Sequence, residues 1–188
     1  MAISGKDPQD LRQNLQQNLG ADPRELIHQA CHDIKGLRHW VAANLGVATG
    51  DFDLWLPIAL TKKGSLYAEV IGRDAQSPHG YKQPIDLSDQ ERQPLYKLGF
   101  DLLRHLEAPP AVYLMQFGFV PKNSGEGEKE VGFDRLFPFP AAPAVASLGI
   151  QEPDLFTCHW HCLTGTPLRD ILILEKNLAP NLVSTASK

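Results

Sequence analysis

The sequence predicts an α+β fold, in which a mostly antiparallel sheet of about five strands packs against an N-terminal helical segment and a second helix. Three observations predict it: two stretches with helix-capping residues, an alternating segment followed by a turn, and a second alternating segment near the C-terminus. The chain has 188 residues, 43% of them apolar, which suits one globular domain. We expect a polar N-terminal arm or short helix over 1–21, one α+β domain over 22–175 and a polar tail over 176–188.

The first predicted helix covers residues 23–45. Asp22 is a good N-cap, Pro23 suits the first helical position, and Gly46 can end the helix in the left-handed conformation. Apolar residues recur every three or four positions between these caps, so one side of the helix is expected to pack against other elements.

A first strand is predicted over 52–60, where apolar residues alternate along one face. Because Pro57 cannot donate a backbone hydrogen bond, the strand is expected at a sheet edge or at a bulge. Residues 61–65 read as a turn into a second strand over 66–71. The Pro- and Gly-containing segment 72–87 is expected to be an irregular loop.

The second helix is expected to begin at Ser88, which forms a capping box with Glu91. Pro94 lies inside this pattern, so we expect either a kink there or a new helix start. Residues 111–120 are apolar on both faces, which is typical of a central strand. The polar stretch 122–132 is expected to be a loop.

Residues 137–149 combine proline with aromatic side chains. This composition fits an extended cover over the core, and it also fits a polyproline-type segment that docks into an aromatic groove. The candidates for such docking are Phe137 and Phe139.

The last predicted element is a hairpin of two strands, 155–163 and 168–174. Its register would place His161 beside Asp170, with His159 on the same face. Two imidazoles and a carboxylate are a ligand set for Zn, Fe or Mn, and His161 with Asp170 could serve in acid-base catalysis. A solvated strand face is the alternative interpretation.

A row of polar residues follows the first helix opposite its apolar stripe: His28, His32, Lys35 and His39. Such a row is typical of a solvated helix face, and it can also form an interaction surface that gains charge below about pH 6.5. We take these four residues, with Phe137 and Phe139, as candidates for binding a partner protein.

Composition narrows the function classes. The net charge of −4 argues against a general nucleic-acid binder, and the sequence offers neither a signal peptide nor a membrane span, so a soluble cytoplasmic protein is expected. Three cysteines in a chain of this length favour reduced thiols.

The common nucleotide-binding, hydrolase and metalloprotease motifs are missing from the sequence. The sequence therefore favours a small non-catalytic adaptor, assembly or regulatory protein that binds another protein and needs no cofactor. The alternative is a metal-dependent or acid-base enzyme that uses His159, His161 and Asp170.

Overall fold

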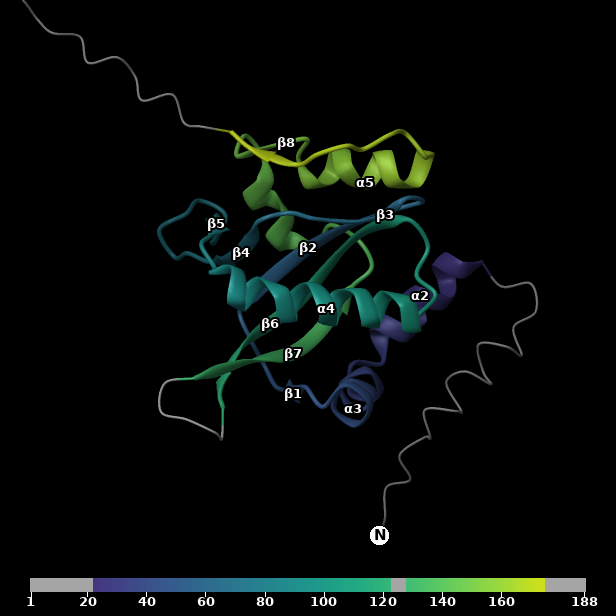
Figure 1. Cartoon of the computed structure of the whole chain (residues 1–188). Coiled ribbons are helices and arrows are strands. Elements are labelled where there is room, and N and C mark those ends of the chain that lie inside the picture. The colour runs from purple at the N-terminus through teal and green to yellow at the C-terminus, as the bar shows by residue number, and fades with distance from the viewer. Residues whose placement is uncertain (1–21, 123–127, 175–188) are drawn as a thin grey trace, which may run out of the picture.

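The fold is centred on a seven-stranded mixed sheet, seen in the computed structural model, which describes residues 22–122 and 128–174 (Figure 1). The strand order is β1-β7-β6-β2-β4-β5, and β3 also pairs with β2. β1 runs parallel to β7, whereas the other described neighbours in this sheet are antiparallel. The expected five-stranded, mostly antiparallel sheet is therefore wrong, because the sheet has seven strands and the parallel pair of β1 and β7 makes it mixed. The strands are β1 (Ala48–Thr49), β2 (Leu54–Thr61), β3 (Gly64–Tyr67), β4 (Val70–Arg73), β5 (Tyr81–Ile85), β6 (Ala111–Pro121) and β7 (Lys129–Phe137).

Helices cover both faces of this sheet, as Figure 1 shows. The first face packs against α2, α3 and α4, and the second packs against a 3-10 helix, η1, and against α5. Two short strands, β8 and β9, follow η1 and α5 respectively and pair as a separate two-stranded antiparallel sheet. These elements are α2 (Pro23–His32), α3 (Ile34–Leu45), α4 (Asp89–His105), η1 (Ala142–Ser147), β8 (Gln151–Glu152), α5 (Leu155–Thr164) and β9 (Leu172–Ile173).

The predicted helix 23–45 is interrupted, and the break lies at Asp33. The Asp33 backbone leaves the helical region, with φ −83° and ψ 68°, and its carboxylate accepts a hydrogen bond of 3.0 Å from the N–H of Gly36. Asp33 therefore starts a new helix, α3, by capping it. The outer caps are confirmed: Asp22 accepts from the N–H of Arg24, and Gly46 has a φ of 64°.

Pro57 lies in the centre of the sheet, so of the two expected positions, a sheet edge or a bulge, the edge is wrong. β2 pairs with β6 on one side and with β3 and β4 on the other. The Pro57 carbonyl accepts a 3.1 Å hydrogen bond from the N–H of Ala68, which lies between β3 and β4. In a strand, the N and the carbonyl of one residue face the same neighbour, so the missing donor faces this interruption and β6 loses no bond.

Three segments differ from their predicted structure. β5 lies inside the expected loop 72–87, and β7 begins inside the expected loop 122–132, whose residues 123–127 lie outside the described ones. The expected hairpin of 155–163 and 168–174 is wrong, because its first half is α5 and its second half contains only β9. The carboxylate of Asp154 accepts from two backbone N–H groups at the start of α5, and Gly165 ends the helix with a φ of 72°. These caps favour a helix over the strand that the short alternation suggested.

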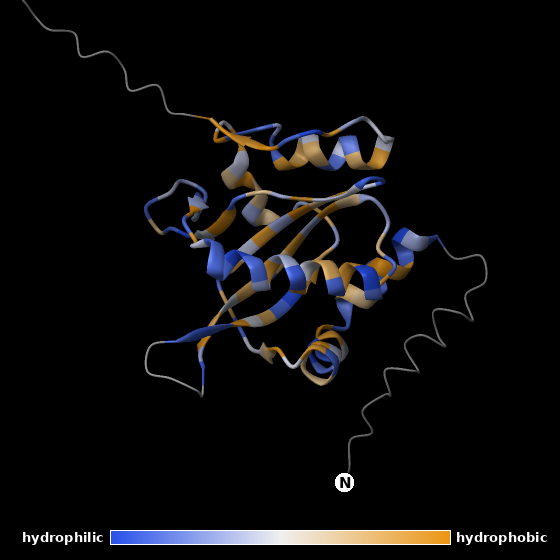
Figure 2. Cartoon of the chain, in the orientation of Figure 1, coloured by the Kyte–Doolittle hydropathy of each residue, from blue (hydrophilic) through white to orange (hydrophobic). Residues whose placement is uncertain are grey.

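The second helix and the cover segment fit their predictions more closely. Ser88 and Glu91 form the capping box, and α4 continues through Pro94 without a second start. η1 buries Pro143 and Ala144, so this part of the Pro-rich segment covers the core. Figure 2 shows hydrophilic residues along much of the exposed side of α4.

The three cysteines are free and buried, and burial raises their pKa values, to about 12 for Cys31 and Cys158 and to about 11 for Cys162. Cys158 and Cys162 belong to the core under η1 and α5, where they pack as small apolar side chains. Within the described residues, no helix is long and apolar enough to cross a membrane.

Candidate functional site

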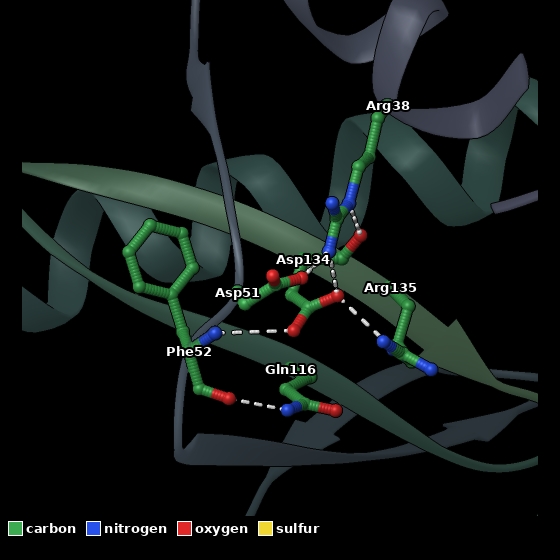
Figure 3. Close-up of polar contacts among 6 residues, drawn as sticks. All are labelled: Arg38, Asp51, Phe52, Gln116, Asp134 and Arg135. Carbon is green, nitrogen blue, oxygen red and sulfur yellow. Dashed lines mark hydrogen bonds and ion pairs between the residues drawn. The ribbon is translucent and has the colours of Figure 1, made fainter. Parts of the chain in front are cut away.

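A buried carboxylate, Asp134 in β7, is the centre of a polar cluster at the β1 side of the sheet (Figure 3). Asp134 is 1% exposed, and its Oδ1 accepts from Arg38 of α3 and from Nε of Arg135, the latter at 3.0 Å. Arg38 also donates from Nε to the Asp134 carbonyl at 3.0 Å and from Nη2 to Asp51 at 2.6 Å. The other Asp134 oxygen accepts from the Phe52 N–H at 3.1 Å. The Asp134 carboxylate thus joins three parts of the chain: α3, β7, and the segment that precedes β2.

A β-bulge in β7 allows this arrangement. Gln116 pairs with Arg135, and the next residue of β6, Phe117, pairs with Phe133, so Asp134 has no partner across the ladder. Bulges often redirect side chains next to functional sites. The Gln116 side chain donates to the Phe52 carbonyl, which extends the polar cluster onto β6.

The Phe52 ring covers the sheet beside the cluster. An added Cβ at Gly118 or Gly132 would lie 2.3 Å or 2.5 Å from atoms of this ring, so only glycine allows such a close approach. The Gly50 N–H donates to the Phe133 carbonyl at 3.0 Å, which fixes the start of the same segment. Together these contacts hold residues 50–52 over β6 and β7.

The charges of the cluster are balanced by two arginines and two aspartates. Hydrogen bonding to Asp51 and then to Asp134 raises the pKa of Arg38, and the Arg38 guanidinium lowers the pKa of Asp51. The two carboxylates differ in accessibility, because the Asp51 side chain is 88% exposed and that of Asp134 only 1%. An external anion can therefore replace Asp51 on Arg38 more easily than it can replace Asp134.

A pocket of about 230 Å³ lies next to the cluster and shares Arg135 with it. His28 and Phe139 stack at its rim, with ring centres 5.8 Å apart and planes inclined by 11°. Four of the six predicted partner-binding residues thus line one pocket, whereas the other two, Lys35 and His39, are exposed on α3. The lining residues are His28, Cys31, His32, Ile34, Arg135, Leu136, Phe137, Pro138 and Phe139.

The other predicted site is not assembled as expected. His159 and His161 lie two residues apart on α5 and therefore point in different directions, and Asp170 is exposed beyond the helix. The pairing of His161 with Asp170 across a hairpin is thus wrong. Among the described residues, no group of three or more His, Cys, Asp or Glu side chains could hold a metal ion.

His159 instead tethers α5 to the sheet. Its Nδ1 accepts a 3.0 Å hydrogen bond from the N–H of Val112 in β6. Burial, and then the nearby charges of Arg24 and His28, lower the pKa of His159, so this imidazole is neutral near pH 7. The Nδ1 of His161 is buried and has no hydrogen-bond partner in the described part of the chain.

The sequence did not reveal the residues of the Asp134 cluster. Arg38 lies 96 residues from Asp134, and no short motif connects the two. Only the unusual buried charge in β7, between Phe133 and Leu136, could have drawn attention to this segment.

Comparisons with known proteins identify the fold. No protein-family model matches the sequence, and a search of curated proteins finds no match. Among solved structures, glycinamide-RNase-transformylase T from Mycobacterium tuberculosis matches with a TM-score of 0.61 and 17% identity, over 80% of this chain and 53% of that one. The fold resembles the ATP-grasp-like fold of that protein.

Two further solved structures show the same likeness of fold. The N5-carboxyaminoimidazole ribonucleotide synthetase from Thermotoga maritima matches with a TM-score of 0.52 and 14% identity, over 68% of this chain and 32% of that one. N5-carboxyaminoimidazole synthetase from Staphylococcus aureus, complexed with ADP, matches with a TM-score of 0.52 and 11% identity, over 68% and 33%. This chain thus spans about half of the first matched protein and a third of the other two.

These matches overturn the functional interpretation of the sequence. The matched proteins are enzymes, so the expectation of a non-catalytic adaptor, assembly or regulatory protein is wrong. That expectation depended mainly on the lack of short catalytic motifs, and a site assembled from distant residues leaves no such motif.

Proposed function

We propose that this protein is a nucleotide-dependent enzyme, or a part of one, and that it binds the phosphates of ADP or ATP at Arg38 and Arg135. The observation that carries the proposal is the pair of guanidinium groups on Asp134, in a fold similar to that of enzymes solved with ADP, such as the synthetase from Staphylococcus aureus. Arginine suits this role because its planar fork matches the geometry of phosphate oxygens.

The cluster offers an anion a defined place to bind. Arg38 is held by two hydrogen bonds to Asp134, one to the carbonyl and one to the carboxylate, so it stays oriented when its contact to Asp51 is lost. A phosphate that replaces the exposed Asp51 gains a charge-assisted hydrogen bond in a partly buried setting. Arg135 uses Nε for Asp134, which leaves its terminal nitrogens for a second phosphate oxygen.

The residues that hold the phosphate would also contribute to reactivity. Phosphoryl transfer depends mainly on positioning and on neutralising negative charge, and the two guanidinium groups supply both.

Isothermal titration calorimetry of the full chain with ADP and with ATP, each with and without MgCl₂, tests the proposal. We expect saturable binding that weakens at least about tenfold in Arg38→Gln, since a lost contact of about 1.4 kcal/mol has this effect. Arg104→Gln on α4 is the matched control and should bind like the wild type. Absence of saturable binding at millimolar nucleotide in every condition would contradict the proposal.

Asp51→Asn gives a second test, in which nucleotide binding is expected to become stronger instead of weaker. If Asp51 is the counter-ion that the phosphate replaces, its neutralisation removes a competitor and should increase nucleotide affinity several-fold. Asp53→Asn, at a neighbouring exposed carboxylate that contacts Arg73 instead, is the control. Weaker binding in Asp51→Asn would show that Asp51 itself contributes to the site.

A further inference from the structure

The pocket between α2 and the end of β7 has the chemistry of a ligand site of its own. From its geometry we infer that it binds a planar aromatic ring that carries an anionic group, with the ring beside Phe139 and the anion on Arg135. The inference rests on the proposed function, because Arg135 borders both the pocket and the phosphate site.

The size of the pocket limits the ligand to about one ring system. Its volume of about 230 Å³ is below the range of about 300–1,000 Å³ that is typical of sites for drug-sized molecules. A whole nucleotide does not fit in it, whereas a single ring with one small substituent does. The pocket is therefore suited to one part of a ligand or to a small second substrate.

Aromatic side chains line the wall where the ring would lie. Phe139 is 41% exposed although it is a large apolar side chain, and His28 is stacked on it. Phe137 meets Phe139 edge to face, with ring centres 6.4 Å apart and planes inclined by 71°. A flat ligand covering Phe139 would bury this exposed apolar surface and gain stacking contacts.

The polar groups of the pocket favour a negative charge. Arg135 engages Asp134 through Nε, and no acceptor among the described residues occupies its terminal nitrogens. His28 and His32 are the other ionisable bases of the lining, and none of the lining residues is acidic. The thiol of Cys31 stays neutral, because burial raises its pKa to about 12. An anionic substituent thus meets a guanidinium with no carboxylate of the pocket competing for it.

Two kinds of ligand could supply the aromatic ring and the anionic group. One is the nucleotide whose phosphates bind the arginines, with its base in the pocket, and the other is a separate small aromatic acid. A fluorescent aromatic carboxylate, 2-aminobenzoate, serves as the test ligand for the full chain, with binding measured from its fluorescence. Cyclohexanecarboxylate, which has the charge without the flat ring, and aniline, which has the ring without the charge, are the matched ligands.

We expect saturable binding of 2-aminobenzoate and at least about tenfold weaker binding of either matched ligand, which corresponds to about 1.4 kcal/mol. Phe139→Leu and Arg135→Gln should each weaken 2-aminobenzoate binding by a similar factor. Phe100→Leu is the matched control, because Phe100 is also an exposed phenylalanine, 52% exposed, and lines a different groove beside α4. Circular dichroism of each variant checks that it is folded. Lack of binding, or binding that Phe139→Leu leaves unchanged, would overturn the inference.

Competition with adenosine, which has the base but no phosphate for Arg135, separates the two sources, and titration with ADP separates the two proposals. If millimolar adenosine displaces 2-aminobenzoate, the ring site takes the nucleotide base; if both bind together, it takes a separate acid. Binding of 2-aminobenzoate without any binding of ADP supports the pocket and contradicts the nucleotide proposal. Binding of ADP without binding of 2-aminobenzoate contradicts the pocket alone.

Discussion

The two faces of the central sheet are built differently. The face under α2, α3 and α4 is packed with large apolar side chains, and Tyr113, Phe117 and Phe133 are fully buried there. The opposite face is apolar under η1 and α5, and Gln116 lies on it beside Leu114, whereas the Asp134 cluster lies at the β1 side of the sheet and reaches α3 through Arg38. The first face provides most of the hydrophobic stabilisation, whereas Gln116 and the Asp134 cluster provide buried polar groups that a binding site needs.

The unpaired polar atoms follow the same division. Trp55 Nε1 and Gln83 Oε1 are buried without a hydrogen-bond partner among the described residues. Trp55 belongs to the core of the second face, and Gln83 bonds to Gln151 close to η1. Because unsatisfied buried polar atoms reduce the free energy of unfolding, these two atoms make the second face less stable than a fully satisfied one would be.

The largest expected effect is on the apolar face. Phe133→Ala removes a fully buried ring between α3 and the sheet, and we expect it to lower the free energy of unfolding by about 3–5 kcal/mol. Chemical denaturation measures this change. Phe100→Ala, at an exposed phenylalanine, should lower it by less than about 1 kcal/mol. Similar losses in both variants would contradict the assignment of the main core to this face.

A smaller effect is expected at the Asp134 cluster. Asp134→Asn replaces the buried charged partner of Arg38 by a neutral one. We expect it to lower the free energy of unfolding by about 2–3 kcal/mol. This is less than is usual for a broken buried ion pair, because Arg38 keeps its contact to the exposed Asp51. Asp53→Asn removes an exposed ion pair and should change the free energy of unfolding by less than about 1 kcal/mol. If Asp134→Asn were as mild as Asp53→Asn, the cluster would not join α3 to β7.

The smallest effect concerns the tether between α5 and the sheet. The pKa of His159 is lower in the folded protein than in the unfolded chain, so the unfolded chain takes up the proton first as the pH falls. The stability from the bond to Val112 is therefore present above the ordinary histidine pKa of about 6.5 and is lost below it.

Unfolding experiments at several pH values measure this contribution. When the pH is lowered from about 7.5 to 5.5, the free energy of unfolding of the wild type should fall by about 0.5–1 kcal/mol more than that of His159→Gln. The amide oxygen of Gln can accept the hydrogen bond from Val112 at either pH. His39→Gln, at an exposed histidine, should behave like the wild type. An equal pH dependence of wild type and His159→Gln would show that the tether does not titrate in this range.

Local patterns predicted the elements whose signals lie within a few residues. The caps at Asp22 and Gly46, the capping box at Ser88 and the turn from β2 into β3 are all confirmed. The prediction failed for β7, whose start lies in a polar stretch, and for α5, whose short alternation resembled a strand. Of the candidate site, the sequence indicated His28, His32, Phe137 and Phe139, but not that they line one pocket.

The sequence by itself thus determined the helix ends at Asp22, Gly46 and Ser88, because capping needs only neighbouring residues. The tertiary structure decided the rest. It selected a helix for 155–164, because a segment of ten residues is only marginally helical in water and depends on packing against β6 and β2. It also brought Arg38 to Asp134 across 96 residues. Such a contact requires closure of the long chain between the two residues, which the sheet provides, so no local pattern could encode it.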